Sequence, residues 1–469
     1  MKPLTPAGST APHRNPRRRA FAAVFGALLV TLAAPCKTAA QAQEAVVTIG
    51  FQDALALARK GPDVSLAQLG VSQAEAARNA TFSAASATLQ GGYSQRWTDA
   101  AGYAPTRGGL APFSLNATFN VVPYGPACDA RATADRSLET AQIALQDVVG
   151  QATLAAAQAY LQALRASQRL ALDATAVEQA QAALTHVQSL RAAGDATDDD
   201  VATAQVGLAQ ASTTRASDRL ALQGALASLS DVLGRPVAAV HGEPPASKDP
   251  QDDDGDAVSG RSDVRRASLA VDASRQDYAA AVRQVLPAAE ASASVQGGDG
   301  SNTWNAAVGF NTNAFQPTLQ AGFTPGGSTL SGGTALNGTS FAITLSLSVP
   351  LDTGLGPALD SAQLSLATAQ QKLARTRQQA TLDIASARRT LQSAQLDVGL
   401  SATQRDLAAA QAAQAAQRFD LGLVAGPSLD QANLAADQAR LAWLTAQDAV
   451  LLDRMALAQA LGLDPMEVF

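Results

Sequence analysis

Three consecutive aspartates, Asp198, Asp199 and Asp200, follow a turn that begins at Gly194. Carboxylates at the start of a helix accept hydrogen bonds from its unpaired backbone N–H groups, so one role for them is to cap the helix that follows. If several copies of this turn met on one axis, the same carboxylates would form a ring that holds cations at a pore. The residues alone leave both roles open.

The sequence lacks the motifs of catalysis and of metal binding. It has no glycine-rich phosphate loop between a strand and a helix, no nucleophile elbow, and no C-x-x-C pair or Cys/His cluster. His186 lies on an Ala/Gln-rich stretch, and Cys128 and Trp443 fit packing positions. The net charge of -6 argues against nucleic-acid binding. We therefore predict a protein that is not an enzyme and has no catalytic residue, no metal site and no cofactor.

The first residues have the pattern of a signal peptide. An arginine-rich start is followed by an apolar run over 20–34 and by the small-x-small site Ala40-Gln41-Ala42. We predict that residues 1–42 are a signal peptide and that the mature chain starts at Gln43. Cys36 is an alternative lipidation site, which the sequence leaves open.

A long stretch of this chain occurs twice. Residues 134–234 recur at 362–462, displaced by 228 positions without an internal gap, so that Gly194 is matched by Gly422. A period this long fits two copies of one structural half rather than a solenoid of short repeats.

The apolar residues of each copy advance by alternating steps of three and four, which is the seam of a coiled coil. A turn follows each long helical stretch, at 192–200 and at 418–430, and a second helical stretch comes after it, so each copy is predicted to form a long helical hairpin. An unbroken helix over 130–190 would extend about 90 Å at the helical rise. The second seam consists of Leu366, Ala369, Leu373, Thr376, Ala380, Ile384, Ala387, Leu391, Ala394 and Val398.

Between the helical parts the apolar period changes to two, which indicates β-strands with one apolar face. Leu115, Ala117 and Phe119 alternate with polar residues in the first copy, and Ile343 and Leu345 do so in the second. The intervening segments, 99–111 and 298–340, are predicted to be exposed loops. Four strands are therefore predicted, near 87–98, 112–123, 287–297 and 341–351.

The length of these strands has a functional implication. Roughly 9 to 11 alternating residues are what a tilted transmembrane β-strand requires. A soluble sheet packed on one face is the alternative. Four strands cannot close a barrel, and open edges are not tolerated in lipid, so closure by several chains is implied. Three chains would supply about twelve strands, within the known range.

The predicted elements divide the mature chain into two repeats and a linker. The first repeat covers 43–234, with helices, two strands and a helical hairpin. Residues 235–262 are rich in Pro, Asp and Gly, so they are predicted to be an irregular linker or belt. The second repeat, 263–469, has a helix, two strands and a second hairpin.

This organisation resembles the TolC-like outer-membrane factors, or outer membrane efflux proteins, which are the exit ducts of tripartite efflux pumps and type I secretion systems. The resemblance covers 46–465 and rests first on the duplicated strand-strand-hairpin order. Its local motifs are Val122-Pro123, Val349-Pro350-Leu351, and Arg418-Phe419-Asp420-Leu421-Gly422-Leu423 followed by Leu429-Asp430.

The resemblance implies a mainly α fold with transmembrane β-strands. It implies a homotrimer with a twelve-stranded β-barrel in the outer membrane and a long α-helical barrel that forms a large periplasmic portion. The implied function is to pass substrates from an inner-membrane transporter and a periplasmic adaptor protein across the outer membrane. Outer-membrane lipid would surround the barrel.

The resemblance also assigns roles to the two turns. They would lie at the periplasmic tip, where the adaptor contacts Gly194, Leu421, Gly422 and Leu423. Carboxylates just inside the tip would form the pore constriction, and the candidates are Asp198, Asp199, Asp200 and Asp430. Val424, Ser428 and Gln431 depart from the family pattern, so how the gate is locked stays open.

The alternative function is that of a periplasmic coiled-coil adaptor or an adhesin, which binds rather than conducts. One helical hairpin and a lipoyl-like β-domain would indicate an adaptor. A single anchor at one terminus would indicate an adhesin. The sequence instead has two hairpins with strands in each half. Neither the transported substrate nor the class of pump can be identified from the sequence.

Overall fold

The computed structural model of this chain describes most of the residues after Val46. The described residues are 47–81, 85–93, 110–119, 126–250, 257–299, 303–312, 316–324, 337–349 and 354–469. The chain divides into two units, Met1–Ala45 and Val46–Phe469, and the elements below belong to the second. The predicted signal peptide lies outside the described residues, as do Val122-Pro123 and Pro350-Leu351.

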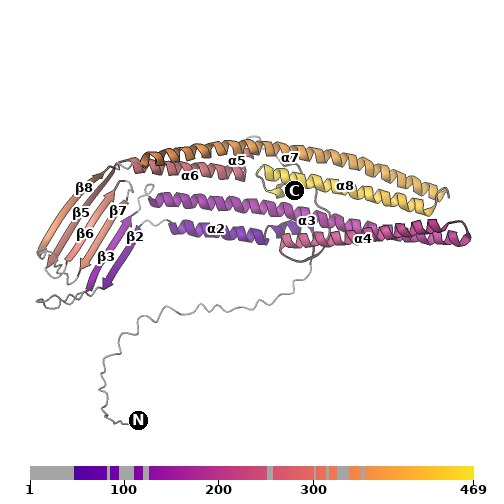
Figure 1. Ribbon diagram of the computed structural model, residues 1–469, viewed down its shortest axis with the longest axis horizontal. Helices are drawn as coiled ribbons and strands as arrows, with labels where there is room; N and C mark the ends of the chain where they lie inside the picture. The colour runs from indigo at the N-terminus through magenta and orange to yellow at the C-terminus, as the bar shows by residue number, and fades with distance from the viewer. Residues whose placement is uncertain are drawn as a thin grey trace, which may run out of the picture. The chain divides into compact units, whose positions relative to one another are not determined.

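Two long helical hairpins dominate the fold (Figure 1). Helix α3 (Pro126–Ala193) has 68 residues and packs against α4 (Asp198–Leu233). Helix α7 (Leu355–Asp420) has 66 residues and packs against α8 (Gly426–Ala460). The predicted long helices are confirmed, and at the helical rise each extends about 100 Å.

The seam of α7 is where the periodicity places it. All ten of its positions are buried or half-buried, although much of the rest of this helix is exposed. Ala380 and Ile384 are buried, and Thr376, the polar member, satisfies its hydroxyl by donating to the carbonyl of Lys372 at 2.9 Å. Small seam residues allow the close approach of the neighbouring helices.

Shorter helices flank the hairpins. Helices α1 (Phe51–Ala58) and α2 (Pro62–Thr81) are separated at Gly61, as the Gly-Pro pair predicts, and α2 packs along α3. In the second half, α5 (Ala257–Gly260) precedes α6 (Ser262–Val285), which packs along α7. The two halves thus share one helical plan.

The linker is more ordered than its composition predicts. Within 235–262 the chain forms β4 (Val237–Val240), which pairs in parallel with β1 (Val47–Ile49), and then α5. The prediction of an irregular segment is therefore wrong for these residues. Strand β4 is short, and its partner lies 190 positions away at Val47, so no local pattern signals the pairing.

A six-stranded antiparallel sheet contains the remaining strands, in the order β2-β3-β7-β6-β5-β8. Each half enters and leaves this sheet through its helices, because α2 precedes β2, α3 follows β3, α6 precedes β5 and α7 follows β8. The strands are β2 (Ala85–Tyr93), β3 (Leu110–Phe119), β5 (Ala288–Asp299), β6 (Thr303–Asn311), β7 (Gln316–Thr324) and β8 (Asn337–Ser348).

The prediction of four strands is wrong, because the segment 298–340 contains the hairpin β6–β7 and is not a loop throughout. Its Gly, Asn and Thr content is typical of loops and concealed an alternation of period two. Trp304, Val308 and Phe310 are spaced by even numbers, as are Leu319 and Phe323. That spacing was the signal available in the sequence.

The main core lies where both halves and the C-terminus meet. Phe51 of α1 packs edge-to-face on Tyr160 of α3 and on Phe469, with ring centroids 5.3 and 5.6 Å apart. Leu229 of α4 and Met455 of α8 are fully buried in the same cluster. The Tyr160 hydroxyl donates to the carbonyls of His241 and Gly242 at 2.5 and 3.0 Å, so this core also holds the chain after β4.

A charged pair joins the two halves beside this core. Arg165 of α3 donates to both carboxylate oxygens of Asp448 of α8, at 2.5 and 2.8 Å, and these side chains are only 10% and 7% exposed. Arg165 also donates to Glu243 at 2.8 and 3.1 Å. These hydrogen bonds lower the pKa of Glu243 below its ordinary value.

We expect Arg165→Met to destabilise the protein strongly, by about 3–5 kcal/mol, because it leaves a buried carboxylate without its partner. Adding Asp448→Leu should recover much of this loss, since no buried charge then remains. Thermal unfolding of the purified variants measures both effects. Arg275→Met is the matched control, because its pair with Asp272 is exposed and such pairs contribute about 0–1 kcal/mol. Strictly additive losses in the double variant would contradict this account.

Candidate functional site

The two hairpin turns have the same backbone geometry. In the first, Gly194 has a φ of 92°, its N–H donates to Arg191, and the Asp195 N–H donates to Leu190. In the second, Gly422 has a φ of 71° and the corresponding bonds go to Phe419 and Arg418. This left-handed glycine cap satisfies the last carbonyls of a helix. The duplication therefore extends to individual hydrogen bonds.

The first turn uses its acidic residues to start α4. Thr197 is the N-cap: its hydroxyl accepts from the Asp200 N–H at 3.2 Å, and the Asp200 carboxylate accepts from the Thr197 N–H at 2.8 Å. This capping box satisfies two unpaired donors reciprocally. The bonds from Thr197 lower the pKa of Asp200, so the box persists at neutral pH and is lost only as the pH falls through that lowered value.

The three aspartates therefore differ in their surroundings. The prediction that they cap the helix holds in detail only for Asp200, with Thr197 as the N-cap itself. Asp198 forms an exposed ion pair with Arg191 at the end of α3. The side chain of Asp199 makes no hydrogen bond or ion pair with the described residues, and it is exposed to solvent. Asp199 is thus the carboxylate that remains for an external partner.

The second turn is apolar where the first is acidic. Leu421 and Leu423 are 73% and 70% exposed, and the ring of Phe419 is 43% exposed. Helix α8 starts after Ala425, which provides no side-chain cap. Exposed apolar residues clustered in this way mark contact surfaces. A Cβ at Gly422 would meet nothing within 4 Å, so its requirement for glycine comes from its backbone angle and not from crowding.

The two turns lie at the same end of the hairpins (Figure 1). Gln179 of α3 donates to the backbone carbonyl of Asp430, at 3.2 Å, and so connects the first hairpin to the second near this end. The Asp430 side chain is exposed. Within the described residues, no contact joins this carboxylate to Asp198, Asp199 or Asp200, so one chain does not assemble all four candidates into one group.

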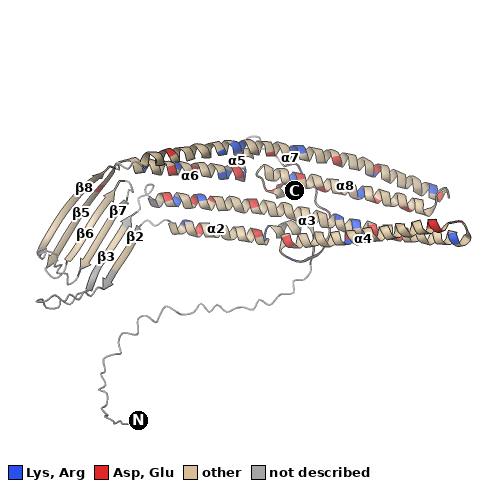
Figure 2. Cartoon of the chain, viewed as in Figure 1, with Lys and Arg blue, Asp and Glu red and all other residues tan. Residues whose placement is uncertain are grey.

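The described residues contain no group of three or more His, Cys, Asp or Glu side chains that could hold a metal ion. None of their helices is long and apolar enough to span a membrane. Charged residues lie almost entirely on the helices (Figure 2). In the six-stranded sheet only Glu290 and Asp299, both on β5, are charged.

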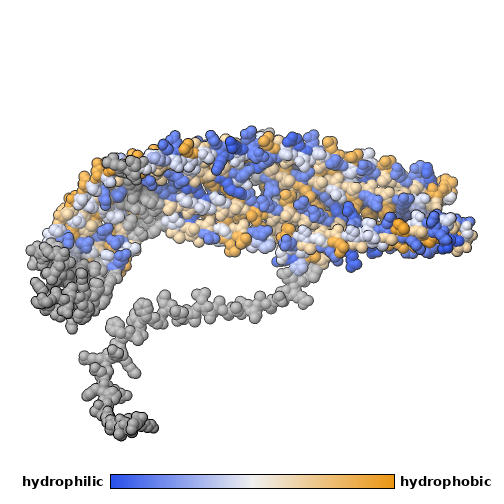
Figure 3. Space-filling model, in the orientation of Figure 1, coloured by the Kyte–Doolittle hydropathy of each residue, from blue (hydrophilic) through white to orange (hydrophobic). Residues whose placement is uncertain are grey.

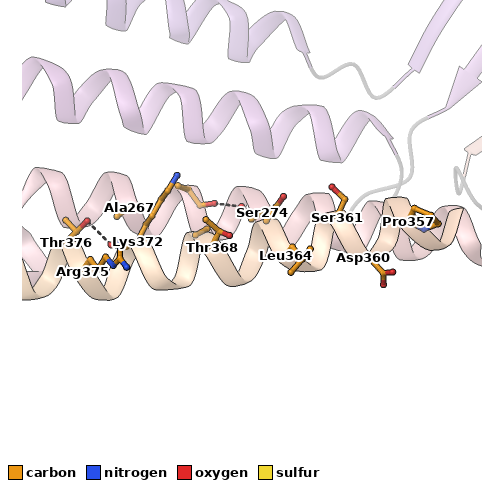
Figure 4. A pocket seen from close by; sticks show the side chains of 13 residues that line it. Ala267, Ser274, Pro357, Asp360, Ser361, Leu364, Thr368, Lys372, Arg375 and Thr376 are labelled. Carbon is orange, nitrogen blue, oxygen red and sulfur yellow. Dashed lines mark hydrogen bonds between the residues drawn. The ribbon is translucent and has the colours of Figure 1, made fainter. Parts of the chain in front are cut away.

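A groove of about 1010 Å³ runs between α6 and α7 (Figure 4). Its walls are mainly small and hydroxyl side chains, with Lys372 and Arg375 near one end and Asp360 nearer the other. Leu364 lies in it although its side chain is 68% exposed. The lining residues are Ala267, Ala270, Ser274, Pro357, Asp360, Ser361, Leu364, Ser365, Thr368, Ala369, Lys372, Arg375 and Thr376.

The strand register places apolar residues of neighbouring strands on one face of the sheet. Leu345 pairs with Ala291, and Ala291 also pairs with Phe310. Phe341, Ile343, Leu345 and Leu347 of β8 are all more than 60% exposed, and hydrophobic residues are visible along this side of the sheet in Figure 3. An uncovered face of this size requires an apolar environment or a partner.

Neither a known protein family nor a curated protein matches the sequence. Solved structures of other proteins match this chain in fold. The CusC structure, described in terms of transmembrane channel formation, matches with a TM-score of 0.64 at 17% identity, over 89% of this chain and 93% of CusC. The outer membrane protein VceC of Vibrio cholerae matches with a TM-score of 0.61 at 19% identity, over 88% of this chain and 96% of VceC. The Campylobacter jejuni CmeC outer membrane channel matches with a TM-score of 0.63 at 15% identity, over 88% of this chain and 85% of CmeC.

This chain has the fold of the outer-membrane channels. The match spans nearly the whole described chain, including both hairpins, so the fold expected from the resemblance to TolC-like outer-membrane factors is confirmed in its mainly helical part. The described strands of the single chain form an open sheet, with β2 and β8 at its edges.

The left-handed backbone at Gly422 leads to a test of the turn. Gly422→Ala should loosen the end of α7 by about 1–2 kcal/mol, because a Cβ is unfavourable at positive φ. Gly422→Asn should cost less, since asparagine tolerates this conformation. Hydrogen exchange of the amides at 418–423 measures the difference. Gly399→Ala is the control, because Gly399 is helical with open space around it. Equal exchange in the Ala and Asn variants would contradict the explanation.

Proposed function

We propose that this protein is the outer-membrane exit duct of a tripartite efflux or type I secretion system. It would pass substrates from an inner-membrane transporter and a periplasmic adaptor protein across the outer membrane. The observation that carries the proposal is the sheet with one uncovered apolar face, in a chain that has the fold of outer-membrane channels. Outer-membrane lipid is the environment that fits this face.

The sheet edges support assembly into a ring. Strands β2 and β8 each have one unpaired side, and unpaired backbone groups are not tolerated in lipid. Because β2 and β8 are at opposite edges, the β8 edge of one chain can pair with the β2 edge of the next. Such head-to-tail contacts close into a ring when the rotation is right, and a homotrimer is the ring that we propose.

The helices support the same contact. Helix α7, which follows β8, has exposed leucines, and its groove with α6 is open beside Leu364. On the other side, α2, which precedes β2, exposes Leu66 and Leu69. A second copy of this chain would cover both surfaces and close a helical barrel that projects into the periplasm. The exposed leucines of α7 are Leu364, Leu382, Leu396, Leu400 and Leu407.

The turns suit the two remaining roles. The apolar surface of Leu421 and Leu423 around Gly422, together with Gly194 of the first turn, is the proposed contact for the adaptor. In a trimer the acidic turns would alternate with the apolar ones around the opening. Asp198, Asp199 and Asp200 from three chains, with Asp430, would then give the constriction its negative charge.

The alternative, an adaptor or adhesin, fits the architecture less well. An adaptor would have one helical hairpin with a lipoyl-like domain, whereas the described residues form two hairpins and a sheet shared by both halves. A soluble sheet would have its apolar face covered, and no described helix packs on this one.

The proposed ring predicts a specific cross-link. Thr88→Cys on β2 and Thr344→Cys on β8 lie on the polar face of the sheet. Combined in one chain with Cys128→Ser, they should give a covalent trimer with a short bis-maleimide in outer-membrane vesicles. Each single variant should remain a monomer in denaturing gels, since one edge then lacks its thiol. Both side chains are exposed in the single chain. A ladder extending beyond three chains, or no cross-link, would count against a closed trimer.

The acidic turn predicts an effect on conductance. Replacing Asp198, Asp199 and Asp200 by Asn should alter single-channel conductance in planar bilayers and reduce block by divalent cations from the periplasmic side. Asp199→Asn alone should reproduce much of the change, because Asp198 is paired with Arg191 and Asp200 is held in the capping box. Asp200→Asn is the matched control. If the triple variant conducts and is blocked like the parent, the residues serve only to start the helix.

A further inference from the structure

The hairpin β6–β7 occupies the middle of the sheet. Strand β7 pairs with β3 of the first half, and β6 pairs with β5 of the second. The twelve strands implied by the resemblance assume four strands from each chain, two from each half. In this sheet the strands of the two halves do not pair directly with each other, because the hairpin lies between β3 and β5.

The hairpin continues the apolar face of its neighbours. Val308 pairs with Leu319 and, on its other side, with Ala293 of β5. Leu319 in turn pairs with Ala117 of β3. One row of apolar residues thus crosses from β5 to β3 through the hairpin, and Ile343 of β8 extends it.

The opposite face is polar along the same strands. Ala307 pairs with Gln320, which pairs with Asn116 of β3. On the other side Ala307 pairs with Ser294 of β5. A lumen lined by small and polar residues, behind a lipid-facing apolar row, is the alternation of a transmembrane barrel wall.

Packing between the strands is specific to this arrangement. Gly297 of β5 lies opposite Trp304 of β6, and a Cβ at Gly297 would meet the indole at 2.5 Å. Gly309 of β6 lies opposite Thr318 of β7, whose hydroxyl would be 2.7 Å from such a Cβ. Glycines placed opposite larger side chains mark close packing within a sheet. The hairpin is therefore fitted to β5 and not merely adjacent to it.

The hairpin also has the length and direction of a wall element. Strands β6 and β7 have nine residues each, enough to cross the bilayer when tilted. Because two strands are inserted, β3 and β5 keep opposite directions, and every pair in the sheet stays antiparallel. An even insertion preserves the pattern that barrel closure requires.

We propose that β6–β7 is part of the membrane-spanning wall and that three copies of this chain close a barrel of eighteen strands. The inference rests on the proposed trimeric duct. Because barrel diameter grows roughly linearly with strand number, the lumen would be about one and a half times as wide as one of twelve strands. The hairpin then sets the width of the outer-membrane pore, and with it the size of substrate that can leave.

Cysteine labelling on adjacent residues tests the hairpin. Val308→Cys and Leu319→Cys would face lipid, whereas Ala307→Cys and Gln320→Cys would face the aqueous lumen; all four carry Cys128→Ser. In outer-membrane vesicles, a sulfonated maleimide should label the lumen-facing pair at least about tenfold faster, because the reactive thiolate is disfavoured in lipid. Equal labelling on both faces would place the hairpin in water and overturn the proposal.

A second pair of variants separates this proposal from the proposed function. Ile343→Cys and Thr344→Cys test the same alternation on β8, which does not involve the hairpin. If the labelling rate alternates along β8 but not along β6–β7, the proposed duct is supported and the eighteen-stranded barrel is contradicted. If the labelling rate does not alternate along β8 either, both the membrane-spanning sheet and the hairpin proposal are contradicted.

Electron cryo-microscopy of the detergent-extracted trimer gives the strand count directly. Eighteen strands are expected, and twelve would overturn the proposal. A variant in which residues 300–336 are replaced by Asn-Gly should close a narrower barrel of twelve strands, because Asp299 and Asn337 are already paired across β5 and β8 and this dipeptide favours a tight hairpin. An unchanged circumference in that variant would also overturn it.

Discussion

The two open edges of the six-stranded sheet limit how this chain can be arranged with other molecules. Strands β2 and β8 leave a row of backbone groups without partners, and the apolar face beside them excludes water as a substitute. Among the described residues, no element of the same chain pairs with either edge or packs on that face. The exposed leucines of α7 and α2 continue the same two sides along the helices. Strands and helices thus support the proposed assembly, in which each chain would complete the next.

Duplication supplied both halves with the same backbone, and the side chains then diverged. The glycine caps at Gly194 and Gly422 have matching hydrogen bonds, yet one turn continues into aspartates and the other into exposed leucines. The buried pair of Arg165 and Asp448 has no equivalent 228 positions away, where Ser393 and Leu220 stand. This pair therefore joins one half to the other beside the core in a way that the duplication does not repeat, whereas the exposed residues of the turns stay accessible to other contacts.

The candidate site was predicted in part. Gly422 and Gly194 could be located because glycine at the end of a long apolar seam is a local signal. The different surroundings of the three aspartates could not be predicted from the sequence, because they depend on where the side chains of Thr197 and Arg191 lie. Asp430 makes no contact with the carboxylates of the first turn in its own chain. This separation likewise depends on how α8 packs against α3.

The long hairpins, their seams and the duplication could be predicted from the sequence, because helical periodicity is a local property that repeats along the chain. The sequence also placed the cores of four strands. The structure was needed to show that β6 and β7 belong to the sheet and that β4 pairs with β1. Strand pairing joins distant residues, and a polar, glycine-rich strand resembles a loop until its partner is known. Trp304 opposite Gly297 is such a contact: only the pairing of the two residues shows that the hairpin belongs to the sheet.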